Sequence, residues 1–200
     1  MGCGSGKHHI IGEEKGRCVF VIGGPCSGRT TQCKNIVTEF KYVQYSLEEI
    51  FKRIILEKNF GGWELLELDL QRGKYISSER VVKILRNIVS NSEEKKILFR
   101  DFPRDHVDLE EWKQKMNDVA DITAILYLEL KDDEIVKRCI EIGQTEESAL
   151  NQIKKFKEDI IPIIPEFEEN KKLIKIDAND VEELIFENIK REFIERKLYV

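Results

Sequence analysis

A short glycine-rich stretch, VIGGPCSGRTTQC, follows an apolar run and has the residue types of a phosphate-binding loop. Gly23, Gly28, Arg29 and Thr30 fill the places of the pattern G-x-x-x-x-G-K-[ST], with arginine where lysine is usual. In that pattern the main-chain amides of the loop surround an anion, and the positive N-terminal end of the next helix adds to the attraction. The stretch therefore predicts a phosphate-binding site with an altered cation.

Two side chains in this loop depart from the usual pattern. Arg29 keeps the positive charge, but a guanidinium is a wide planar fork, whereas the lysine ammonium is a compact donor that can follow a moving phosphoryl group. Cys26 adds a side chain where glycine is common, and it is interpreted either as a reactive thiol at a helix N-terminus or as a small filler. The spacing predicts anion binding, and the substitutions argue against efficient catalysis.

The elements that would position this loop alternate between strand and helix along the chain. Apolar runs at 18–22, 95–99, 122–130 and 172–176 predict buried strands, and 42–45 is a weaker candidate. Helices are expected at 30–40, 46–56, 77–89, 109–116, 132–142, 146–169 and 181–197, with Pro162 and Pro165 perturbing the sixth. This order predicts one α/β domain with a parallel five-stranded sheet covered by helices, and ligands bind such sheets beyond the carboxyl ends of the strands.

Length, charge and cysteine content narrow the class of protein. Two hundred residues suit a single domain, and a net charge of −5 argues against general binding to nucleic acid. The number of cysteines is odd and they form no CxxC pair or metal-ligand spacing, which favours a reducing, cytoplasmic location. No apolar run has the length of a membrane-spanning helix.

The first 16 residues are polar and glycine-rich and are interpreted as a flexible leader before a domain at 17–200. Gly2 and Cys3 could carry a myristoyl and a palmitoyl group, and two acyl chains together anchor a protein stably to a membrane. Such a leader would place the protein at a membrane or in a cytoskeletal or ciliary assembly. Gly6 stands where the acylation pattern needs serine or threonine, so an unmodified leader or an added Gly-Ser-Gly segment stays open.

Several ordered motifs resemble those of the adenylate kinase and UMP-CMP kinase family, the nucleoside monophosphate kinases. They run from about Arg17 to the C-terminus and are GGPCSGRTTQC, YSLEEIFKR, GKYISSE, RDFPRDHVDLEEW, VKRCIEIG and KLIKIDA. The resemblance implies a P-loop fold of that type with sites for ATP and a nucleoside monophosphate. It also implies phosphoryl transfer from MgATP, a reaction that depends mostly on positioning and on cancelling charge.

The resemblance also implies roles for individual residues. Arg29, Arg104 and Arg138 stand at catalytic arginine or lysine positions of the family. Lys52 replaces the arginine that grips the monophosphate, and Asp108 replaces the residue that reads its base. The nucleotide-binding residues implied in this way are Gly23, Gly24, Ser27, Gly28, Thr30, Thr31, Lys52 and Asp108.

Other family cations are missing from this chain. Ile142 and Gln152 stand at two arginine positions, and the lid segment with its own arginine is absent after Gly143. Arg100 replaces the aspartate that helps to hold the magnesium shell, which argues against Mg²⁺ and would let the guanidinium fill part of that site. A shift of one residue would offer Asp101 instead, but the motif Phe-Pro-Arg that follows fixes the alignment.

Each lost charge-assisted contact can cost about 2–4 kcal/mol in the transition state. We therefore expect a nucleotide-binding protein with weak or lost phosphotransfer, serving as a structural or regulatory module of an assembly or membrane. Its expected partners are ATP or a nucleoside monophosphate, a protein assembly partner and a membrane. The alternatives are an active kinase that transfers the γ-phosphate of ATP to AMP, UMP or CMP, and a membrane-tethered adaptor that binds no nucleotide.

Overall fold

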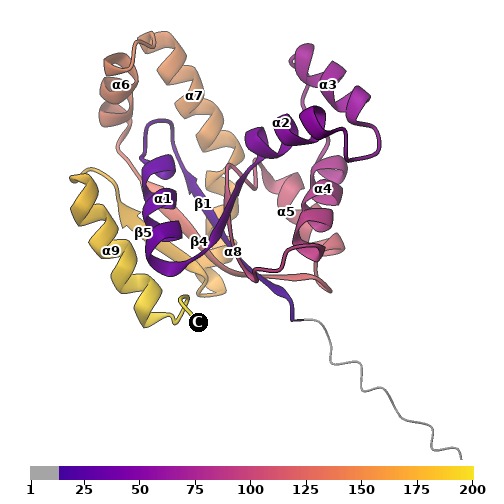
Figure 1. The fold of residues 1–200 in the computed structure, drawn as a ribbon. Coiled ribbons are helices and arrows are strands. Elements are labelled where there is room, and N and C mark those ends of the chain that lie inside the picture. The colour runs from indigo at the N-terminus through magenta and orange to yellow at the C-terminus, as the bar shows by residue number, and fades with distance from the viewer. Residues whose placement is uncertain (1–13) are drawn as a thin grey trace, which may run out of the picture.

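The computed structural model describes residues 14–200, so the predicted acylation sites Gly2 and Cys3 lie outside the described residues. The described chain forms a five-stranded sheet in which every neighbouring pair of strands is parallel, with helices on both faces (Figure 1). This confirms the fold class predicted from the sequence. The strands are β1 Gly16–Gly23, β2 Val43–Ser46, β3 Lys96–Arg100, β4 Ala120–Glu129 and β5 Leu173–Asp177.

The helices follow the predicted order, with three differences. The helix expected at 146–169 is wrong as one element: α7 ends at Asp159, and a 3₁₀ turn and a short helix follow, because proline has no amide hydrogen to donate to the preceding turn. An additional helix, α3, follows Gly62, and α5 begins three residues earlier than expected. The helices are α1 Arg29–Phe40, α2 Leu47–Glu57, α3 Trp63–Gln71, α4 Ser78–Ser90, α5 His106–Lys115, α6 Asp132–Glu141, α7 Glu146–Asp159, α8 Ile164–Glu169 and α9 Glu182–Glu195, with the 3₁₀ turn at Ile161–Ile163.

The strand order is β2-β3-β1-β4-β5, so β1 lies in the middle of the sheet. The chain occupies one side of β1 through β3 and then crosses to the other side at β4. In open α/β sheets a ligand binds outside the carboxyl ends of the strands where the strand order reverses. The loop between Gly23 and α1 lies at that place, which is where the sequence predicts an anion site.

Alternate residues of β1 belong to opposite faces of the sheet, as the period of a strand requires. Phe20 packs in the cluster that includes helices α2, α4 and α5, whereas Val19 and Val21 pack in the cluster that includes α1 and α9. All three side chains are fully buried. The sheet therefore has a core on both faces, and its central strand holds the glycine-rich loop on a rigid base.

An aromatic cluster fixes the segment that follows β3. The Phe20 ring meets the rings of Trp112 and Phe102 edge-on, with centroids 5.0 and 5.4 Å apart, and Phe99 packs against the same tryptophan. Such pairs stabilise a core by about 0.5–1.5 kcal/mol beyond the area that they bury. Because Phe102 is held in this cluster, Arg104 leaves the core at a defined point beside the loop.

Two arms rise on either side of the strand ends, α2 with α3 on one side and α6 with α7 on the other (Figure 1). Residues 142–145 alone join α6 to α7, which agrees with the shortened lid expected from the sequence. Among residues 14–200, no helix has the length and apolar character needed to cross a membrane.

Candidate functional site

The glycine-rich loop has backbone conformations that its sequence makes accessible. Gly28 has φ 85°, in the left-handed region that glycine adopts without strain, and it precedes the first turn of α1. At Gly23 a Cβ atom would lie 2.4 Å from Ser27 Oγ and 2.9 Å from the Leu128 carbonyl oxygen, so only glycine fits there. Cys26 also has a left-handed backbone, with φ 55°, which is costly for a residue with a side chain.

The N-terminal end of α1 has the features of an anion site. No side chain caps it, and no acidic residue lies in its first turn, where Thr30 and Thr31 follow Arg29. The hydroxyl oxygen of Ser27 is buried without a hydrogen-bond partner among the described residues, although Ser27 is only 1% exposed. Unpaired amides at a helix start and an unpaired buried hydroxyl are groups that an anion would satisfy.

Two arginines from different elements meet at this helix start. Arg29 Nη1 donates to Asp101 Oδ1 at 2.8 Å, and Arg100 Nη1 donates to Thr30 Oγ1 at 2.5 Å. Arg100 also lies 3.2 Å from the other carboxylate oxygen of Asp101. The Asp101 carboxylate therefore does reach the loop, but it lies between two guanidinium groups.

The arginine of the Phe-Pro-Arg motif is bound by a carboxylate on the next turn of the chain. Arg104 Nε and Nη2 donate to the two oxygens of Asp108 at 2.8 Å each, and the main-chain amide of Arg104 donates to Asp108 Oδ2 at 2.9 Å. Asp108 is fully buried, and the Arg104 guanidinium lies 4.0 Å from the centroid of the Tyr75 ring. Burial raises the pKa of the Tyr75 hydroxyl, and its hydrogen bond to Asp105 raises that pKa further.

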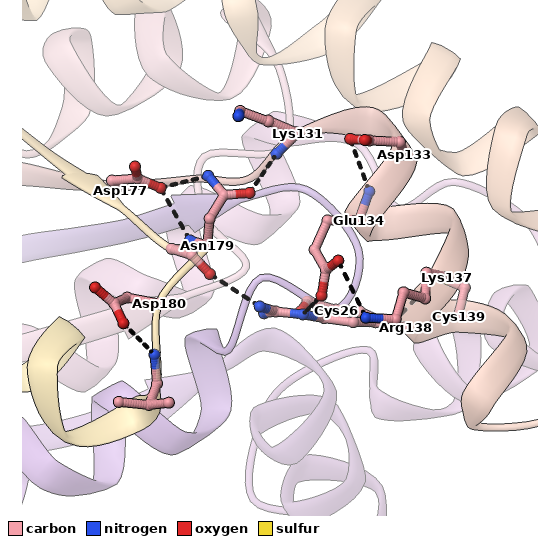
Figure 2. A network of polar contacts seen from close by, with 12 residues as sticks. Cys26, Lys131, Asp133, Glu134, Lys137, Arg138, Cys139, Asp177, Asn179 and Asp180 are labelled. Atoms are coloured by element: carbon pink, nitrogen blue, oxygen red, sulfur yellow. Dashed lines mark hydrogen bonds and ion pairs between the residues drawn. The ribbon is translucent and has the colours of Figure 1, made fainter.

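The third predicted arginine joins three elements, as Figure 2 shows. Arg138 of α6 donates from Nε to Glu134 at 2.9 Å, from Nη2 to the Ala178 carbonyl at 3.1 Å and from Nη1 to the Cys26 carbonyl at 3.4 Å. This side chain therefore holds α6 against the loop and against the end of β5. Its guanidinium borders the loop with most of its donors already bonded to protein atoms.

Two cavities flank the loop. One, which we call the arginine cavity, has a volume of about 320 Å³ and lies between Gly23, Arg29, Arg104 and the α7 residues Gln152 and Lys155. The other, which we call the loop cavity, has a volume of about 410 Å³ and lies between residues 26–30 and the α6 arm at Arg138, Glu141 and Ile142. Cations from three separate elements, Arg29, Arg104 and Lys155, line the arginine cavity, together with the carboxylates of Asp101 and Asp159. Three cations against two carboxylates leave a positive excess, which suits a negatively charged ligand.

Of the residues predicted from the sequence, the structure brings together the loop and the three arginines. The two positions at which the family's arginines are missing also lie here: Gln152 lines the arginine cavity, and Ile142 lines the loop cavity with 67% of its surface exposed. Lys52 lies elsewhere on α2, exposed and paired with Glu48 at 2.5 Å, and the residues lining these two cavities do not include it.

Sequence reasoning missed Lys155. Lys155 is an exposed residue that lines the arginine cavity, and its side chain forms no ion pair or hydrogen bond with the described residues. Residues three apart on a helix share a face, so the spacing from Gln152 to Lys155 could have shown that a cation lies one turn from the lost arginine.

The Thr30 hydroxyl, which the loop pattern places at a magnesium ion, lies among charged side chains of the protein. The Thr30 hydroxyl accepts a hydrogen bond from Arg100. The nearby Asp101 carboxylate forms ion pairs with Arg29 and Arg100. Among residues 14–200, no group of three or more His, Cys, Asp or Glu side chains is arranged to hold a metal ion. Hard divalent cations need oxygen ligands with negative charge, and this part of the loop presents a cation.

Comparison with known proteins agrees with this geometry. The family model for adenylate kinase matches residues 21–172. The chain is 30% identical over 191 residues to the UMP-CMP kinase of Bos taurus, covering 90% of this chain and 97% of that protein. It is 31% identical over 185 residues to the UMP-CMP kinase of Mus musculus, covering 86% and 94%. It is 29% identical over 192 residues to UMP-CMP kinase 3 of Oryza sativa subsp. japonica, covering 92% and 89%.

The match extends over most of the described domain and includes the loop, the Phe-Pro-Arg segment and both arms. It confirms the family inferred from the ordered motifs. The chain belongs to the adenylate kinase family of nucleoside monophosphate kinases.

Proposed function

We propose that this protein binds nucleotide at the glycine-rich loop with weak or lost phosphotransfer, and that it serves as a structural or regulatory module of an assembly or membrane. The observation that carries the proposal is the hydrogen bond from Arg100 to Thr30. The family binds ATP and nucleoside monophosphates as substrates and uses Mg²⁺ in phosphotransfer.

Binding without turnover follows from the groups that remain. The loop amides, the unpaired Ser27 hydroxyl and the cations of the arginine cavity can hold phosphate oxygens. In P-loop proteins the hydroxyl at the position of Thr30 holds the magnesium ion that bridges the β- and γ-phosphates. With Arg100 on that hydroxyl, we infer that the guanidinium supplies the positive charge and that nucleotide binds without the metal.

Transfer needs more than binding. The transition state spreads negative charge over the γ-phosphoryl oxygens, and only contacts that strengthen there raise the rate. Two cation positions at the cavities hold Ile142 and Gln152, and each missing contact can cost about 2–4 kcal/mol. If the two losses added, they would slow transfer by about three to six orders of magnitude, because about 1.4 kcal/mol is tenfold.

One observation favours the second candidate, an active kinase for AMP, UMP or CMP. Lys155 reaches the arginine cavity beside Arg29 and Arg104, so one cation on α7 stands close to the lost arginine. The relatives at about 30% identity bear the name UMP-CMP kinase. Under this alternative, the positive charge of Lys155 replaces that of the arginine lost at Gln152 and cancels part of the negative charge on the transferred phosphoryl group.

A coupled phosphotransfer assay with ATP and each of AMP, UMP and CMP distinguishes the two candidates. The proposal expects ATP to raise the melting temperature of the full chain while turnover stays at least about a thousandfold below that of a UMP-CMP kinase assayed beside it. Turnover within tenfold of that kinase would establish the active enzyme instead. A melting temperature unchanged by any of these nucleotides would leave the adaptor without nucleotide as the correct interpretation.

The membrane part of the proposal rests on Gly2 and Cys3 alone. Metabolic labelling with an alkyne analogue of myristate, in cells that express the full chain, tests it. We expect labelling that is lost in Gly2→Ala, and a Cys3→Ser variant that keeps the myristate but leaves the membrane fraction, because one acyl chain binds only marginally.

A further inference from the structure

Two cysteines that are far apart in the sequence meet beside the glycine-rich loop. Cys26 Sγ lies 3.3 Å from Cys139 Sγ, although 113 residues separate them. Cys26 belongs to the loop and Cys139 to α6, and Figure 2 shows them on the two elements that Arg138 joins. Cys26 is half-buried and lines the loop cavity, whereas Cys139 is fully buried.

We propose that Cys26 and Cys139 are a site of covalent modification: a peroxide oxidises them to a reversible intramolecular disulfide that ties the glycine-rich loop to α6. The disulfide itself does not depend on the proposed nucleotide binding. Its expected consequence, a loss of nucleotide affinity, does rest on the proposed function.

The contact is close enough for a bond with little movement. A disulfide bond is about 2.05 Å long, so the two sulfur atoms need to approach by only about 1.2 Å. Cys26 lies in a loop, and such a segment adjusts more easily than the middle of a strand or helix. Once one of the two sulfur atoms is oxidised, a thiol held in contact with it attacks it far faster than a thiol from solution does.

The difference in exposure decides which of the two cysteines is oxidised first. Cys26 borders the loop cavity, so a small oxidant can reach its sulfur, whereas burial and then the hydrogen bond with Cys26 raise the pKa of the Cys139 thiol to about 11. The other described cysteines, Cys18 and Cys33, are fully buried in the two cores, and burial raises the pKa of each. Among residues 14–200, Cys26 is therefore the cysteine that a peroxide meets first.

The chemistry balances with a peroxide as the oxidant. Cys26 loses its proton and its sulfur attacks one peroxide oxygen; the O–O bond breaks, and the leaving oxygen takes a proton, which leaves Cys26 as a sulfenic acid. Cys139 then loses its proton and attacks the Cys26 sulfur; the S–S bond forms, the S–O bond breaks, and the leaving hydroxide becomes water. The two thiols together lose two electrons and two protons, and the peroxide gains them.

The bond would join two walls of the loop cavity. Cys26 lies on the loop wall, and Arg138 and Ile142 on the α6 wall, within a few residues of Cys139. A loop that closes its amides around phosphate must be free to adjust, and a covalent tie to α6 removes part of that freedom. We therefore expect the oxidised protein to bind ATP more weakly by about tenfold, a usual size for coupling between two events in one protein.

The first test uses the full chain with Cys3→Ser, which removes disulfides between molecules through the leader. The protein is treated with hydrogen peroxide, alkylated, digested without reduction and analysed by mass spectrometry. We expect a peptide pair joined through Cys26 and Cys139, lighter by two hydrogen atoms than the two peptides and separated by dithiothreitol. Cys26 carried to sulfinic acid, with Cys139 still free to be alkylated after unfolding, would overturn the proposal.

The second test titrates ATP into the reduced, the oxidised and the re-reduced protein. We expect affinity to fall by about tenfold on oxidation and to return on reduction, and Cys26→Ala, which lacks the thiol that peroxide attacks, to bind ATP equally before and after peroxide. Equal affinity in the reduced and cross-linked wild type would overturn the predicted consequence and leave the disulfide standing. Reduced protein that binds no ATP would refute the proposed function and this consequence together, while the mass measurement still decides the disulfide.

Discussion

The guanidinium of Arg100, at the end of β3, donates a 2.5 Å hydrogen bond to the hydroxyl of Thr30, in the first turn of α1. The contact places a fixed positive charge where proteins with this loop bind their metal ion. Asp101 follows Arg100 directly and pairs with both Arg29 and Arg100, and Glu49 of α2 lies 3.9 Å from Nη2 of Arg100. We propose that this guanidinium supplies positive charge for the phosphates of a nucleotide.

The first prediction concerns the metal dependence of binding. ATP should bind the wild-type protein with affinities that differ by less than about threefold between excess Mg²⁺ and EDTA, because Arg100 supplies the charge. Arg100→Asp reverses that charge and should weaken binding in EDTA by at least about tenfold, with recovery in Mg²⁺. Isothermal titration calorimetry measures both. Wild-type affinity that falls sharply when magnesium is removed would contradict the prediction, and Arg191→Asp, an exposed change on α9, is the matched charge control.

The second prediction concerns Lys155 in the arginine cavity. Lys155→Gln should weaken ATP binding by about tenfold, because a charge-assisted hydrogen bond contributes about 1.5 kcal/mol. Lys154→Gln removes a charge from the neighbouring position, where the ammonium lies 3.9 Å from Glu158 and outside the cavity, and should change little. Fluorescence titration with a labelled ATP gives both values. Equal losses in the two variants would mean that only the net charge of α7 matters.

The sheet could be predicted well because its strands are encoded locally. Short apolar runs bounded by turn residues predict all five strands. The helix expected at 46–56 is α2, and its cap is Ser46, whose hydroxyl accepts from the amide of Glu49 at 3.3 Å. The helix α3 was missed because it follows two glycines and buries only Leu66 fully. The early start of α5 was missed because its cap is Asp105, which comes only two residues after Pro103 and whose carboxylate accepts from the Asp108 amide.

The site was predicted in part, and the missing part is long-range. The loop glycines and the positions of Arg104 and Arg138 followed from motifs. Of the carboxylates that the three arginines bind, Asp108 and Glu134 stand four residues from their partners in the sequence. Asp101 reaches Arg29 across 72 positions, and that pair could not be predicted because it depends on how β3 approaches the loop. The contact between Cys26 and Cys139 depends on the packing of α6 against the loop, and nothing in their spacing of 113 residues indicates it.

The third prediction concerns the buried pair of Asp108 and Arg104. Asp108→Ala should lower the free energy of unfolding by about 3 kcal/mol, because it leaves a half-buried guanidinium and a main-chain amide without their acceptor. Asp118→Ala removes the carboxylate of an exposed pair with Arg86 and should leave that free energy nearly unchanged. Urea unfolding followed by circular dichroism compares the two. If Asp108 instead serves only to read a base, its loss would change nucleotide affinity and leave stability intact.

The fourth prediction is a loss of stability at alkaline pH. Burial raises the pKa of the Cys33 thiol to about 12, and burial also raises the pKa of Cys18, whereas a thiol in the unfolded chain titrates near 8.5. The stability that these protonated thiols contribute is therefore complete below about pH 8.5 and is lost as the pH rises from about 9 toward 12. Each thiol contributes a slope of up to about 1.4 kcal/mol per pH unit. In urea unfolding under reducing conditions, Cys33→Ala should show a shallower alkaline slope, and an unchanged slope would contradict the assignment.

The fifth prediction asks whether the altered cations are what limits turnover. Arg29→Lys combined with Arg100→Asp returns a compact ammonium to the loop and removes the guanidinium from the Thr30 hydroxyl, so an oxygen ligand faces the place of the metal. Turnover with ATP and the best of AMP, UMP and CMP should rise by at least about tenfold and become magnesium-dependent. Adding Gln152→Arg, at a position that lines the arginine cavity, should raise turnover again. Arg29 and Arg100 both pair with Asp101, so the two loop changes are not independent. Each change alone should lower the activation free energy by less than half as much as the two changes together.

The control in the coupled assay is Arg191→Lys, an exposed change on α9. A triple variant that folds and binds ATP but turns over no faster than the wild type would show that these three positions do not limit turnover.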